Sequence, residues 1–164
     1  MDIHETDTIH TTMDRTMAIQ ELLERYASGE RDFGDVDLRG AQLNGINFSG
    51  VNLRGADLRA ASLNRATLWG VDLTGAHLEN TSLRHTDLRR ARLVGANLQG
   101  TDLSEALLVG ADLTEALLQG ANLRGANLYC ARLSPAQLQM AIEAGARLYD
   151  PALSARRPRV LALS

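Results

Sequence analysis

The chain has 164 residues, of which 45% are hydrophobic and 23% charged, and its formal net charge is −3 at pH 7. This length fits one domain, and the single cysteine, Cys130, excludes an internal disulfide framework. No apolar run reaches the roughly 18 residues of a membrane span, and the N-terminal segment has neither the basic start nor the apolar stretch of a signal peptide. We therefore expect a cytoplasmic protein with no membrane insertion.

The first thirty residues contain seven acidic residues and two arginines. We predict a mobile acidic tail over residues 1–15, in which His4 and His10 could bind a metal only weakly, so no metal site is expected. Residues 16–30 are predicted to form an N-terminal capping helix that stops near Gly29, because apolar side chains recur there at helical spacing. These side chains are Ile19, Leu22, Leu23 and Tyr26.

From Phe33 to Leu133 every fifth residue is leucine or phenylalanine, and a second column, mostly alanine, lies two positions earlier. On an α-helix a step of five residues turns by about 140°, which would scatter the leucines around the axis. In an extended chain, residues two apart point to the same side, so both columns can face inward if the chain turns once per unit. The pattern predicts a coil of short strands and turns around a leucine core.

The repeated unit carries a small residue, Asp or Asn, and then leucine. Examples are Ala56-Asp57-Leu58, Ala96-Asn97-Leu98, Ala111-Asp112-Leu113 and Ala126-Asn127-Leu128. On this pattern the chain resembles the pentapeptide-repeat family over residues 31–135, and its entry segment is similar to that of cyanobacterial members. The resemblance implies an all-β fold, a right-handed quadrilateral β-helix with four units per coil. Residues 31–134 would then form a solenoid of about five coils with short helical caps at both ends.

At the C-terminal end, Ser134, Pro135 and Gln137 have the pattern of an N-cap, a first helical residue and a capping-box glutamine. We predict a capping helix within residues 135–146, closed by Gly145. This helix would place three apolar side chains on the last coil, namely Leu138, Ala141 and Ile142.

Alternatively the coil continues, because Leu138, Leu148 and Leu153 keep the five-residue register. The helix is favoured because Glu143 falls on the same register, where a buried carboxylate would be costly. Residues 147–164 are predicted to be a tail whose arginines could contact an acidic partner or nucleic acid, although solvated arginines are the simpler interpretation. These are Arg156, Arg157 and Arg159.

If one coil takes twenty residues, positions twenty apart stack and form surface columns. One such column contains Trp69, Arg89, Val109 and Tyr129, with Leu107 on the same face. Exposed aromatic and apolar side chains predict a partner-binding patch, on which Arg89 could stack on Trp69. The alternative is that these residues are scattered substitutions on a tolerant surface. The candidate anion contacts are Arg84, Arg90 and Arg92, although their side chains would spread around the corners of the coil.

Catalysis has little support, because His77 is expected to stack between Asp57 and Asn97 in a solvated ladder, without a nucleophile or carboxylate pair in a cleft. We expect no enzyme activity and no cofactor.

The leading hypothesis is a non-enzymatic interaction scaffold or regulatory binding protein with a protein partner. The alternative that the resemblance implies is a mimic of B-form DNA that binds DNA gyrase. Residues 31–134 contain eleven acidic residues and eleven arginines, which disfavours that mimic. Nucleic acid is not an expected partner, and the oligomeric state stays open.

Overall fold

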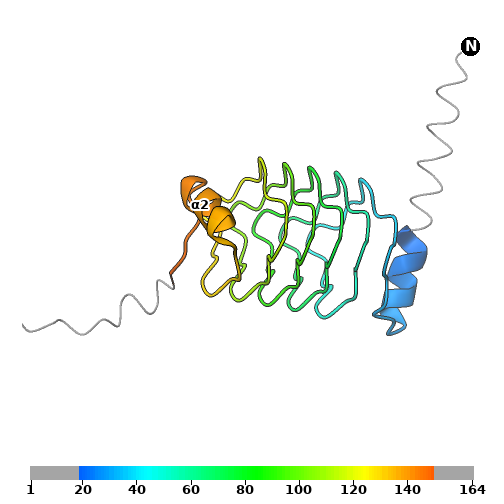
Figure 1. The fold of residues 1–164 in the computed structure, drawn as a ribbon. Helices are drawn as coiled ribbons and strands as arrows, with labels where there is room; N and C mark the ends of the chain where they lie inside the picture. The colour runs from blue at the N-terminus through cyan, green and yellow to red at the C-terminus, as the bar shows by residue number, and fades with distance from the viewer. Residues whose placement is uncertain (1–18, 150–164) are drawn as a thin grey trace, which may run out of the picture.

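The computed structural model describes residues 19–149, and its centre is a stack of coils (Figure 1). Parallel β-bridges join residues twenty positions apart, from Asp32 with Asn52 to Asp112 with Arg132. One coil therefore contains four five-residue units. Each bridge involves a single residue per unit, so the described chain forms a β-helix of short extended segments and turns, without long strands.

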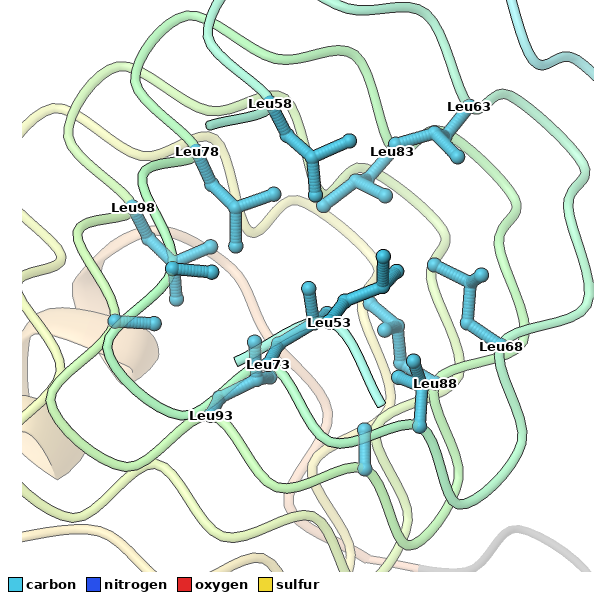
Figure 2. Close-up of a cluster of buried hydrophobic side chains, with 14 of the residues drawn as sticks. Leu53, Leu58, Leu63, Leu68, Leu73, Leu78, Leu83, Leu88, Leu93 and Leu98 are labelled. Atoms are coloured by element: carbon cyan, nitrogen blue, oxygen red, sulfur yellow. The ribbon is translucent and has the colours of Figure 1, made fainter. Parts of the chain in front are cut away.

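The leucines of the five-residue register fill the interior of this β-helix. They form four columns that point inward, and leucines twenty residues apart, such as Leu58 and Leu78, stack directly (Figure 2). Leu73, Leu78 and Leu83 have no solvent-exposed surface. Two large side chains per unit would not fit inside such narrow coils at the density of a protein interior. This explains why alanine dominates the second inward column.

Threonine replaces alanine at three buried positions of that column, and each hydroxyl group has a hydrogen-bond acceptor. Thr81 donates to the carbonyl of Leu58 at 2.6 Å, and Thr86 donates to the carbonyl of Leu63 at 2.8 Å. Thr101 does the same with Leu78 at 2.6 Å. The buried hydroxyl groups therefore link successive coils instead of remaining unsatisfied.

The last residue of each unit turns the chain at a corner and has a positive φ. Glycine adopts this conformation without strain, as at Gly70 (φ +64°). For other residues the left-handed conformation costs about 1–2 kcal/mol. Nevertheless nine corners carry a side chain: Asp35, Ala60, Arg65, Asn80, His85, Arg90, Glu105, Glu115 and Cys130.

At the N-terminal end a helix is described from residue 19 to residue 27, and it packs against the first coil (Figure 1). Leu22 is buried, and the Tyr26 ring meets Phe48 edge to face, with 5.0 Å between the ring centroids. Arg31 is the one charged member of the small-residue column. Its guanidinium lies over the Tyr26 ring at 4.2 Å and donates to the Tyr26 carbonyl at 2.9 Å. Arg31 is tolerated because it lies at the open edge of the solenoid and is itself exposed.

Helix α2 (Pro135–Glu143) covers the other end, with Ser134 as N-cap and Gln137 completing the capping box. Its orientation differs from the prediction for two residues, because Leu138 is 39% exposed and Ile142 is 50% exposed. The buried residues of α2 are Gln137 and Ala141. Gln137 Nε2 donates to two carbonyls of the last coil, at 2.8 Å each. A leucine at this position would leave the Ala116 carbonyl without a donor and the Leu113 carbonyl with only the N–H of Ala116.

After α2 the chain returns to the five-residue register. Arg147 forms a bridge with Asn127, and Leu148 packs against the core. The structure thus combines the two alternatives for this segment, because a helix replaces part of a coil and the five-residue register then resumes. The predicted start of the tail at residue 147 is therefore too early. The predicted acidic tail with His4 and His10, and residues 150–164 with Leu153 and the three arginines, lie outside the described residues.

Candidate functional site

The candidate partner-binding residues lie on one side of the solenoid, which we name the Trp69 face. It carries, on successive coils, the buried residues Phe48, Leu68, Leu88, Leu108 and Leu128. Three backbone hydrogen bonds of 2.9–3.0 Å connect its coils at the corners. They join Gly70 N–H to the Arg89 carbonyl, Arg90 N–H to the Val109 carbonyl and Gly110 N–H to the Tyr129 carbonyl. The predicted column of Trp69, Arg89, Val109 and Tyr129 is therefore formed, and Leu107 lies beside it in the column of bridge residues.

Apolar side chains are exposed on the Trp69 face. Trp69 is 45% exposed and Leu107 is 40% exposed, while Val109 and Tyr129 are partly buried. Tyr149 is exposed and lies twenty residues beyond Tyr129, two residues after the bridge of Arg147 with Asn127. The sequence analysis did not include Tyr149 among the candidate residues, because it assigned residue 149 to a tail. The spacing of twenty residues between the two tyrosines is the signal that would have placed Tyr149 in the same register as Tyr129.

The expected stack of Arg89 on Trp69 is not formed. Arg89 instead binds Asp87 with two hydrogen bonds, Nε to Oδ1 at 2.8 Å and Nη2 to Oδ2 at 2.6 Å. Cation–π contacts in the described part of the chain involve Arg25 and Arg31 only. The bonds to Arg89 hold the pKa of the Asp87 carboxyl below its ordinary value. This ion pair cancels the charge of Arg89, which leaves an aromatic and aliphatic surface beside it.

The same geometry recurs at Asp57, whose pKa is lowered first by its side-chain hydrogen bond with Arg59. A carboxyl whose pKa is depressed on folding stabilises the protein above its unfolded-state pKa, about 3.9. That stability is lost as pH falls through the folded-state value. We expect the melting temperature to decline below about pH 4, and to decline less in the variant Asp57→Asn/Asp87→Asn. Thermal unfolding at pH 2–7 followed by circular dichroism measures this, and parallel curves for the two proteins would contradict it.

The three candidate anion contacts are not brought together. Arg84 Nε lies 3.8 Å from Asp102, and Arg92 Nε lies 3.9 Å from Asp72. The Arg90 guanidinium, at a corner with φ +58°, makes no hydrogen bond or ion pair among residues 19–149. Arg84 lies just before the corner at His85, Arg90 lies at the next corner, and Arg92 lies two residues after that corner. The three side chains therefore leave the coil on different sides.

The structure places His77 in a column of polar side chains on the surface. His77 bridges Asp57 and Asn97 as expected, with its Nδ1 atom 3.8 Å from Glu79. Within residues 19–149, no cluster of three or more His, Cys, Asp or Glu side chains is arranged to hold a metal ion. No helix in that range is long and apolar enough to cross a membrane.

Comparison with known proteins identifies similar chains. The model for pentapeptide repeats matches residues 32–70, 72–108 and 106–141, with eight copies. A pentapeptide repeat protein from Nostoc Pcc 7120 is 32% identical, with a TM-score of 0.50 over 80% of this chain and 95% of that chain. One from the Arabidopsis thaliana thylakoid lumen is 27% identical, with a TM-score of 0.52 over 70% of this chain and 83% of that chain.

A third similar structure is QnrB1, a plasmid-mediated fluoroquinolone resistance protein. It has a TM-score of 0.61 at 21% identity, over 76% of this chain and 62% of that chain, so the likeness concerns the fold alone. A search of curated proteins found no match.

Proposed function

Because the chain belongs to the pentapeptide-repeat family, we propose that it is a non-enzymatic binding protein that presents the Trp69 face to a protein partner. The observation that carries this proposal is the column of Trp69, Val109 and Tyr129 with Leu107 beside it. Outward positions elsewhere on the solenoid are mostly polar. Trp and Tyr dominate binding energy at protein interfaces because they bury large apolar areas while their polar atoms keep hydrogen-bond partners.

The electrostatics of this face favour an apolar partner surface. Arg89 is already neutralised by Asp87, so a partner does not need a carboxylate to satisfy it. The backbone hydrogen bonds between coils hold the column rigidly, which reduces the entropy lost on binding. An extended or flat apolar surface of the partner fits these features.

Substitution on the Trp69 face tests the proposal. We expect Trp69→Ala/Tyr129→Ala to remove the partner from affinity capture with the full chain, because each truncation of an interface aromatic typically weakens binding by about 2 kcal/mol or more. The control is Leu117→Ala, since Leu117 is 43% exposed and lies two faces away. Capture that is unchanged by the double substitution, or equally reduced by Leu117→Ala, would contradict the proposal.

The gyrase-binding alternative is less well supported. A mimic of DNA needs a strongly negative rod, but the repeats carry equal numbers of acidic residues and arginines. Several of the aspartates are also held in ion pairs, as in Arg39–Asp37 and Arg59–Asp57. We expect the purified protein to leave DNA supercoiling by gyrase unaffected, and inhibition or protection at stoichiometric concentration would favour the alternative.

A further inference from the structure

A polar hollow lies beside the Trp69 face, on the neighbouring side of the solenoid and at the corner between the two. We name it the Arg65 hollow. It has a volume of about 380 Å³ and is lined by Asn44, Asn64, Arg65, Arg84 and His85. No carboxylate belongs to this lining, although Asp and Glu are common elsewhere on the repeats.

The two asparagines of the lining have amide orientations that hydrogen bonds fix. Asn44 Oδ1 accepts the backbone N–H of Asn64 at 2.9 Å, and Asn64 Oδ1 accepts the backbone N–H of Arg84 at 3.0 Å. Because a backbone N–H is always a donor, these bonds fix which side-chain atom is oxygen and which is nitrogen. Both carbonyl oxygens are thereby used. The Asn64 Nδ2 group donates to Ser62 Oγ at 3.0 Å, whereas the amide N–H groups of Asn44 make no hydrogen bond among residues 19–149.

Neither corner side chain of the hollow pairs with a carboxylate, and Glu105 at the same corner of the next coil pairs with Arg147 at 3.3 Å. The Arg65 guanidinium and the His85 imidazole make no hydrogen bond or ion pair among residues 19–149. Arg84 has only the long contact of 3.8 Å with Asp102. Elsewhere arginines such as Arg59 and Arg89 bind the aspartate two residues earlier in bidentate geometry. The arginines of the hollow lack such an aspartate, since residues 63 and 82 are leucine and serine.

Two of the non-glycine corner residues with a positive φ belong to the hollow. Arg65 has φ +58° and His85 has φ +55°, while Gly45, Glu105 and Gly125 occupy the same corner on other coils. Glycine would relieve the strain at both positions. The chain therefore keeps two exposed, unpaired side chains on adjacent coils where a glycine would be less strained.

We propose that the Arg65 hollow binds an oxyanion, a phosphate or carboxylate group, through Arg65, Arg84, His85 and the amide groups of Asn44 and Asn64. Guanidinium groups bind oxyanions with charge-assisted hydrogen bonds, and the lining contains no carboxylate that would compete for them. The oxyanion comes either as a free ion or as a side chain of a protein. This site is independent of the contact proposed for the Trp69 face.

Titration of the full chain with inorganic phosphate, followed by amide chemical shifts, tests the proposal. Saturable shifts are expected at residues 64–65 and 84–85, with sodium chloride at equal ionic strength as the control for screening. A second titration uses a phosphoserine peptide without other charged side chains. Tighter binding of the peptide assigns the oxyanion to a protein side chain, and equal or weaker binding assigns it to a free ion.

The variant Arg65→Gly separates binding from stability. It is expected to weaken phosphate binding by about tenfold, because one charge-assisted interaction is lost, and to raise the melting temperature by about 2–4 °C, because strain is relieved. The matched control is Arg90→Gly, since Arg90 has the same φ of +58° but does not line the hollow. It should gain the same stability and bind phosphate like the parent.

Two results would overturn the proposal. One is phosphate affinity within twofold of the parent in Arg65→Gly, and the other is chemical shift changes that sodium chloride reproduces. If Arg65→Gly proves less stable than the parent, Arg65→Gln removes the charge without adding glycine and gives the same comparison of binding.

Discussion

Substitution of Leu83 by alanine is expected to lower the free energy of unfolding by about 2–5 kcal/mol. Leu83 has no exposed surface and stacks with Leu63 in one of the inward columns (Figure 2). The cavity cannot collapse easily, because backbone hydrogen bonds fix the spacing between coils. Leu83 N–H donates to the carbonyl of Asp102 and Leu63 N–H donates to that of Ser82, at 2.8 Å each. We therefore expect a value in the upper half of this range.

Denaturant unfolding followed by circular dichroism measures the effect, as a lower midpoint with an unchanged slope. The control is the same substitution at Leu107, which is 40% exposed. It should cost less than about 1 kcal/mol, because little apolar surface is removed from the interior. Equal losses of unfolding free energy for Leu83→Ala and Leu107→Ala would show that the position of a leucine in the five-residue register does not decide how much it contributes to stability.

The inward columns could be predicted because every unit imposes the same constraint. A residue such as Leu83 must face inward whichever coil it belongs to, and its neighbour in the second column must be small. The same regularity places positions twenty residues apart in one column, which is why the Trp69 face could be predicted from spacing alone. Tyr149 obeys the rule as well, but the helix between it and Tyr129 conceals the register.

Side-chain pairing could not be predicted in the same way, because local geometry competes with stacking between coils. Asp87 lies two residues before Arg89 on the same side of one extended segment, so a bidentate ion pair forms within the unit. The alternative partner, Trp69, belongs to the preceding coil. Arg65 differs from Arg89, because no aspartate lies two residues before it. Its guanidinium therefore has no partner among the described residues.

The prediction for α2 was right for Ala141 and wrong for Leu138 and Ile142, because it rested on hydrophobicity alone. That criterion places Leu138 and Ile142 on the last coil. The open end of a β-helix also exposes backbone carbonyls that the next coil would have satisfied. In the preceding coil the Leu117 N–H donates to the carbonyl of Ala96 at 2.9 Å. The equivalent carbonyl of Ala116 receives its hydrogen bond from the side chain of Gln137.

The variant Gln137→Leu is therefore expected to lower the free energy of unfolding by about 2–3 kcal/mol, although it adds apolar surface at a buried position. The Ala116 carbonyl would lose its donor, and the Leu113 carbonyl would keep only the N–H of Ala116. The capping box would also be broken, because Gln137 Oε1 accepts the N–H of Ser134 at 2.7 Å. The loss is expected as a lower midpoint in denaturant and as faster amide exchange in α2.

Two further variants assign the loss to these hydrogen bonds. Gln137→Glu keeps an acceptor for Ser134 but removes the donor to the carbonyls, so it should be destabilised like Gln137→Leu. Gln139→Ala should cost less than about 0.5 kcal/mol, because that exposed side chain bonds only Glu143, one helical turn away. Should Gln137→Leu match the parent protein in stability, apolar packing through Ala141 would suffice to hold α2. The carbonyls of the last coil would then not determine which face of the helix is buried.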